Sequence, residues 1–141
     1  MAWYNNRKND YYTKVIAIFL PGFAGKRKTA LWREYMKKVK ITAIRKASYP
    51  DLMAQYENPI QHACDVQEGQ VWIANEGKKP EGFCDSAWDS ISLFVKTLAS
   101  GGGNFYDGWM KNPYSAMISC NDGFRPVSFY IEAMDEEKEK Y

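Results

Sequence analysis

The sequence has few cysteines, a single histidine and no long apolar run, and each shortage excludes a class of protein. Three cysteines in 141 residues are an odd number at low density, which does not fit a secreted fold stapled by disulfides. The longest apolar run, at residues 15–20, ends at Pro21-Gly22. It is far shorter than the roughly 20 residues that a membrane-spanning helix needs, and it lacks the cleavage site of a signal peptide. We therefore expect a cytoplasmic protein with free thiols and no membrane span.

Charge is unevenly distributed along the chain. Residues 1–35 hold seven of the 19 Lys and Arg but only two of the 17 Asp and Glu. The remainder, residues 36–141, is therefore mildly acidic, which argues against nucleic acid as a partner. The plentiful aromatic residues indicate a globular chain, and its length predicts one domain with a single core.

The character of the sequence changes at Met36. Residues 37–45 alternate, with Val39, Ile41 and Ala43 on one face, as in a half-buried strand. Residues 1–35 show no convincing period, so we interpret them as a basic N-terminal extension. This extension is either an appendage that docks on a membrane or partner, or lies upstream of a true start at Met36. We expect one domain over residues 36–134 and a charged tail over residues 135–141.

The remaining elements follow from periodicity and turn signals. We expect a short helix at residues 51–57 and a second strand at residues 70–75, whose continuous apolar run indicates a central position buried on both faces. An apolar stripe at three- and four-residue spacing predicts a long helix over residues 86–100. Two further strands, at residues 115–120 and 127–133, predict an antiparallel hairpin around an Asp-Gly turn. The order from Met36 is β-α-β-α-β-β, which predicts an α+β fold with a small sheet of about four strands and one main helix packed on it.

The start of the long helix carries the most specific signal. Asp85 or Ser86 is the expected N-cap, with Asp89 completing a capping box, and Gly101 is the expected stop. Cys84 precedes the helix, where unpaired N–H groups and a partial positive charge stabilise a thiolate. Asp85 and Asp89 oppose that effect. The alternative is that Cys84 is a small buried apolar residue at a tight turn.

Other candidate site residues lie in the connections between elements. His62 could act as a general base. Arg125 could clamp an anion or, paired with Asp122, only fix the hairpin turn. Trp109 belongs to an aromatic loop that either covers a pocket or packs over one end of the sheet. The candidates for ligand binding are Cys64, Cys120, Asp122, Arg125, Trp88 and Trp109.

A metal site is a weaker interpretation. His62, Cys64, Cys84 and Cys120 are the ligand types of a Cys₃His zinc site. Structural zinc sites usually draw their ligands in close pairs, such as two cysteines three positions apart, and this chain has none. An iron–sulfur cluster normally takes four cysteines. We therefore assign no metal ligands and keep metal binding as an alternative.

Several of these stretches together resemble a known family. They are residues 36–42, Pro80-Glu81-Gly82-Phe83-Cys84 and Asp122-Gly123-Phe124-Arg125-Pro126-Val127. The resemblance covers residues 36–134 and is to a family of small uncharacterised proteins, mostly from anaerobic bacteria and archaea. It implies an intracellular setting, a start near Met36, and Cys64, Cys84 and Cys120 as the cysteines of the family pattern. The family has no established activity, and the cofactor is unknown. Members often have a second cysteine where this chain has Ser119, which weakens a cluster-ligand role.

Three functions remain open at this point. The first is a small binding or accessory domain with a pocket lined by the three cysteines and the aromatic residues of the 105–114 loop. Its partner would be a metabolic enzyme or a small molecule. The second is a thiol-dependent enzyme in which Cys84 is the nucleophile, Asp85 or His62 assists, and Arg125 holds an anionic substrate. The third is a metal-binding protein. The sequence does not indicate the oligomeric state.

Overall fold

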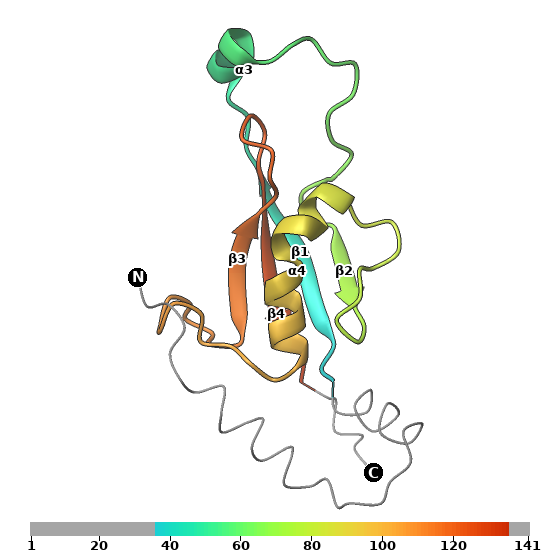
Figure 1. The fold of residues 1–141 in the computed structure, drawn as a ribbon, viewed down its shortest axis with the longest axis vertical. Helices are drawn as coiled ribbons and strands as arrows, with labels where there is room; N and C mark the ends of the chain where they lie inside the picture. The colour runs from blue at the N-terminus through green and yellow to red at the C-terminus, as the bar shows by residue number, and fades with distance from the viewer. Residues whose placement is uncertain (1–35, 136–141) are drawn as a thin grey trace, which may run out of the picture. The chain divides into compact units, whose positions relative to one another are not determined.

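The computed structural model describes residues 36–135. The expected N-terminal extension, the alternative start at Met36 and nearly all of the charged tail concern residues outside this range. The elements are β1 (Val39–Lys46), α3 (Pro50–Tyr56), β2 (Val71–Ala74), α4 (Asp85–Ala99), β3 (Ser115–Ser119) and β4 (Val127–Ala133) (Figure 1). Within residues 36–135, no helix is both long and apolar enough to cross a lipid bilayer.

The four strands form one antiparallel sheet in the order β2-β1-β4-β3. Ile131 of β4 is paired with Ile41 of β1 on one side and with Ala116 of β3 on the other. The expected hairpin of β3 and β4 is therefore confirmed. So is the α+β fold with a small four-stranded sheet and one main helix.

The core lies between this sheet and α4. Strand alternation places Ile41 and Phe129 on the covered face, and the apolar stripe of α4 packs against it (Figure 1). Burying each large apolar side chain stabilises the fold by about 1.5–3 kcal/mol. The large side chains that are fully buried are Phe129, Ile41, Ile91, Leu98, Ile131, Val39, Val95 and Val127.

The expected central position of β2 is wrong. Among the described strands β2 pairs only with β1, so it forms an edge of the sheet. Ala74 is buried in the core, whereas Val71 faces away from it and is 49% exposed. A continuous apolar run in so short a segment does not distinguish an edge strand from a central one.

The helix start also differs from expectation. Cys84, not Asp85 or Ser86, is the N-cap residue of α4, and no side chain caps the helix. Asp85 is already the first helical residue and its carboxylate pairs with the Lys79 ammonium. The expected stop is confirmed, because Gly101 follows the C-cap with a φ of 83°.

The connection between β3 and β4 is longer than a tight Asp-Gly turn. Gly123 does not adopt the positive φ that a two-residue hairpin turn of this type requires. Instead the Asp122 side chain accepts hydrogen bonds from the backbone N–H groups of Phe124 (2.9 Å) and Arg125 (3.3 Å). The carboxylate thus organises the turn, which is a common role of Asp in loops.

An arm extends the sheet beyond α4. The N–H of Ala47 donates to the carbonyl of Pro126 (2.9 Å), and the N–H of Tyr49 donates to that of Phe124 (2.8 Å). These bonds continue the pairing of the two chain segments beyond β1 and β4, and α3 follows at a distance from the main helix α4 (Figure 1). The chain then returns to β1, where Gly69 donates to the carbonyl of Ala43 (2.7 Å). We call residues 47–68 and 120–126 the arm.

Candidate functional site

All three cysteines line one pocket of about 90 Å³. They are free thiols and half-buried. Each comes from a different part of the chain: Cys64 from the loop between α3 and β2, Cys84 from the start of α4, and Cys120 from the hairpin connection. The full lining is Ala63, Cys64, Val66, Cys84, Ser86, Ala87, Cys120, Asp122, Arg125, Val127 and Phe129.

Aromatic packing fixes the position of Cys84. The N–H of Phe83 donates to the carbonyl of Pro80 (3.2 Å), which closes a turn directly before the helix. Phe83 is buried, and its ring lies 4.9 Å from that of Trp72 and 5.4 Å from that of Phe129, between centroids. Because Phe83 is anchored in the core, the next residue is placed at the edge of the core and beside the pocket.

Backbone pairing fixes the position of Cys120. Its N–H donates to the carbonyl of Val127 (3.1 Å), and its sulfur accepts a hydrogen bond from the N–H of Val127 (3.3 Å). The two contacts hold the thiol at the point where the hairpin strands separate.

Lys46 holds the loop that carries Cys64. Its ammonium donates to the backbone carbonyls of Cys64 (3.3 Å) and Val66 (2.9 Å). The N–H of Lys46 also donates to the Glu68 carboxylate (2.8 Å). Lys46 was not among the residues predicted for the site. The register of β1 shifts between Ala43 and Arg45, so Lys46 lies opposite Val127 and shares its face. Simple alternation along the strand would have placed it on the other face.

Arg125 is held between two carboxylates. Its guanidinium donates to the carboxylate of Asp122 (2.8 Å), which lies three positions earlier in the chain. It also donates to both carboxylate oxygens of Glu57, which lies 68 positions earlier. The Arg125 and Glu57 side chains are only 15% and 16% exposed. Hydrogen bonding to Glu57, together with Asp122, raises the pKa of Arg125 above its ordinary value, although burial acts in the opposite direction. The three groups together carry one net negative charge, which disfavours the capture of an anion at this point.

Asp122 is held as a carboxylate. Burial raises the pKa of its carboxyl group, but the hydrogen bonds from the Phe124 N–H and from the Arg125 guanidinium outweigh burial. The pKa of Asp122 therefore lies below its ordinary value.

Four of the predicted site residues do not line this pocket. His62 is exposed and pairs with Asp65 (2.9 Å), and Asp85 pairs with Lys79 on the surface. The ring of Trp88 packs against Phe83 (6.2 Å between centroids). Trp109 packs on Tyr106 (5.2 Å).

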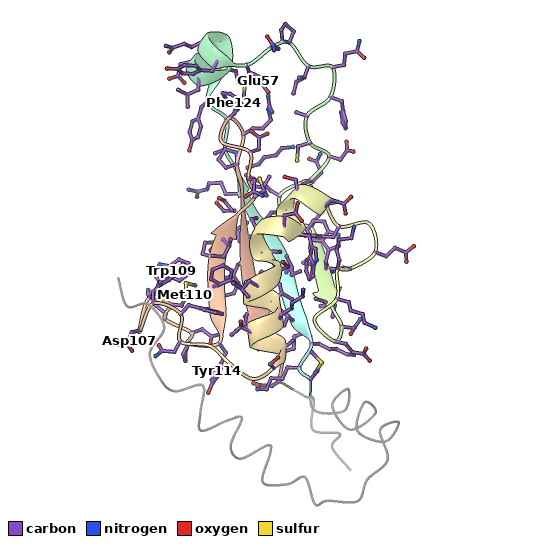
Figure 2. The ribbon with its side chains drawn as sticks, in the orientation of Figure 1. Glu57, Asp107, Trp109, Met110, Tyr114 and Phe124 are labelled. Atoms are coloured by element: carbon purple, nitrogen blue, oxygen red, sulfur yellow. The ribbon has the colours of Figure 1, made fainter. Side chains whose placement is uncertain are left out.

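The aromatic loop lies at another end of the sheet. Trp109 and Tyr114 lie far from Glu57 and Phe124, which mark the arm (Figure 2). Phe105 packs against Phe94 on α4 (5.0 Å between centroids). The loop therefore packs over one end of the fold, and the aromatic side chain in the pocket is Phe129 of β4.

The described residues do not assemble a metal centre. Between residues 36 and 135, no three His, Cys, Asp or Glu side chains are placed so that they could hold one ion. The three cysteines thus line one pocket, but they are not placed so that they could coordinate one metal ion. Comparisons with protein-family models, curated proteins and solved structures found no match.

Proposed function

We propose that this protein is a small binding domain whose ligand occupies the three-cysteine pocket. The observation that carries the proposal is that three cysteines from separate parts of the chain line a single pocket. Loops positioned by a rigid scaffold are where binding residues concentrate. A cytoplasmic location and an accessory role beside a metabolic enzyme are parts of the same proposal.

The lining favours a small, polarisable and uncharged ligand. Five of the lining residues are apolar: Ala63, Val66, Ala87, Val127 and Phe129. Thiol sulfur is itself soft and polarisable. The charged lining groups, Asp122 and Arg125, are paired with each other, and Arg125 also pairs with Glu57. A volume of about 90 Å³ is well below the roughly 300 Å³ at which pockets for drug-sized ligands begin, so the ligand has only a few heavy atoms.

Probe binding followed by NMR tests this proposal. Xenon and dimethyl sulfide are suitable probes, because both are small, uncharged and polarisable. We expect either probe to shift the amide signals of Cys64, Cys84 and Cys120. Ala63→Leu, which adds volume at the lining, should abolish the shifts. Ala54→Leu is the matched control, since Ala54 is an exposed alanine of α3 that does not line this pocket. Absent shifts, or shifts that survive Ala63→Leu, would refute the binding function.

A second candidate function is thiol chemistry at Cys84. Its basis is that Cys84 is the N-cap residue of the 15-residue helix α4 and lines the pocket, where the helix end stabilises negative charge. His62 and Asp85, the groups expected to assist, do not line the pocket. The test is the alkylation rate of each cysteine by iodoacetamide, followed by mass spectrometry. If Cys84 reacts no faster than free N-acetylcysteine at neutral pH, it is not an activated nucleophile.

A further inference from the structure

The helix of the arm exposes its apolar side chains. None of the seven residues of α3 is buried. Tyr56 is 69% exposed, Ile60 is 51% exposed, and Tyr49 and Leu52 are also exposed. Beside the helix lies a hollow of about 580 Å³, lined in part by Met53, Pro59 and Ile60. Clustered exposed apolar residues are a mark of interaction sites.

This apolar surface is nevertheless held in place. The guanidinium of Arg125 ties Glu57, directly after α3, to Asp122 in the hairpin connection. The N–H of Tyr49 donates to the carbonyl of Phe124 (2.8 Å) and fixes the start of the helix. Polar contacts, and not burial, therefore position α3. A surface that is already ordered loses less entropy when a partner binds.

The arm is strongly acidic. Residues 47–68 and 120–126 contain five carboxylates and one guanidinium, a surplus of four negative charges with His62 neutral. Lys46 at the base of the arm directs its ammonium inward, to the carbonyls of Cys64 and Val66. The carboxylates are those of Asp51, Glu57, Asp65, Glu68 and Asp122.

We propose that the arm docks a basic amphipathic segment of a partner protein. The apolar side chains of that segment would fill the hollow beside α3, and its Lys and Arg side chains would lie against the acidic surplus. Complementary charge steers such encounters and suppresses wrong partners. The same charge repels nucleic acid, an anionic membrane surface and the arm of a second copy. The proposal does not depend on a ligand in the three-cysteine pocket.

Titration of the full chain with a defined peptide tests the proposal. The probe is a synthetic amphipathic helix of leucine and lysine, about 18 residues long, and a leucine–glutamate peptide of the same pattern is its matched control. We expect the lysine peptide to shift the amide signals of residues 49–60 and 122–125 in NMR spectra. The binding should weaken as salt is added. The glutamate peptide should not bind.

Two variants test whether the lysine peptide binds at the arm and not elsewhere on the surface. Met53→Ser combined with Ile60→Ser should raise the Kd of the lysine peptide about tenfold or more, because both residues line the hollow that the peptide is expected to fill. Neither side chain is buried, so the fold should persist, which unchanged amide positions in β1 and β4 would verify. Leu93→Ser, at an exposed leucine of α4, should leave the Kd unchanged.

Several outcomes would overturn the proposal. They are the absence of lysine-peptide binding, equal binding of the glutamate peptide, an unchanged Kd for the double variant, and shifts that lie outside the arm. Arm shifts that grow with protein concentration in the absence of peptide would indicate a second copy as the occupant instead.

Discussion

Two glycines after α4 are needed because other atoms come close to them. A Cβ on Gly103 would lie 2.5 Å from the carbonyl oxygen of Pro113 and 3.0 Å from the ring of Tyr114. A Cβ on Gly102 would lie 2.8 Å from the Thr97 methyl group. Any side chain at these positions forces a shift of backbone or of packed neighbours. The two glycines let the aromatic loop pack against the end of the helix.

Gly103→Ala should therefore destabilise the fold. Overpacking typically costs about 1–3 kcal/mol, and the atom that would be struck is a backbone carbonyl that cannot swing aside. Urea unfolding measures the change in the free energy of unfolding. Gly123→Ala is the matched control, because no atom lies within 4 Å of its Cβ position. Equal stability of the two variants would show that the close approach at Gly103 is unimportant.

Asp122 makes stability depend on pH. Its pKa is lowered in the folded state, relative to about 3.9 in an unfolded chain. The contribution of its carboxylate is thus fully present above pH 5 or so and is lost as the pH falls through the folded-state pKa. Asp122→Asn should cost stability at pH 7, and the difference from the native chain should shrink toward pH 2 or so. Urea unfolding across this range measures it. A difference that is constant with pH would mean that charge is not involved.

The site residues differ in how far the sequence could reveal them. Cys64, Cys84, Cys120, Asp122 and Arg125 lie in connections or at element ends, which local turn and capping signals indicate. That they line one pocket is seen only in the fold. The pair of Arg125 with Asp122, which one of the two interpretations required, is present. Glu57 lies 68 positions from Arg125, and no local pattern reports so distant a partner.

At the scale of elements, α4 carries much of the core on one face. Ile91 is fully buried, whereas Leu93, two positions later, is 64% exposed. Ile91→Ala should lower the free energy of unfolding by about 2–5 kcal/mol, since it removes buried methyl groups and leaves a cavity. Leu93→Ala should change it by no more than about 0.5 kcal/mol. Urea unfolding of both variants measures the contrast, and similar losses would contradict the packing of α4 described above.

Polar contacts, in contrast, hold α3. Arg125→Gln removes the link between Glu57 and Asp122. We expect faster hydrogen exchange at the amides of Met53 and Glu57, which donate within this helix segment, because local opening no longer breaks an ion pair. Amides of β1 and β4 should keep their protection. Arg45→Gln, at an exposed arginine, is the control, and equal acceleration in both variants would assign the effect to lost charge alone.

Periodicity predicted the helices and strands better than it predicted which strands lie next to each other in the sheet. The stripe of α4 and the alternation in β1 and β4 arise from burial on one face, which sequence records directly. Strand order is different, because it depends on which edges meet in space. That is why β2 was expected at the centre and lies at an edge. The bulge in β1 was equally invisible, yet it turns Lys46 toward the pocket loop.

At the scale of the whole molecule, the pocket and the arm share residues. Arg125 lines both the three-cysteine pocket and the hollow beside α3. Cys64 and Asp122 belong to the arm and also line the pocket. A ligand in the pocket and a partner on the arm would thus contact one connected set of side chains. Coupling between the two binding events would follow if either one shifts Arg125 between its two carboxylates.

Residues 36–135 form a four-stranded sheet with α4 packed on one face. The pairing of β1 with β4 begins at Val39↔Ala133, and the buried apolar residues of this described range run from Val39 to Ile131. We therefore predict that residues 36–141, expressed alone, fold and unfold in one cooperative transition. Urea unfolding followed by both tryptophan fluorescence and circular dichroism measures this, with the full chain as control. Coincident curves are expected. Two separated transitions, or a fragment without dispersed amide signals, would show that residues 1–35 are needed for the fold.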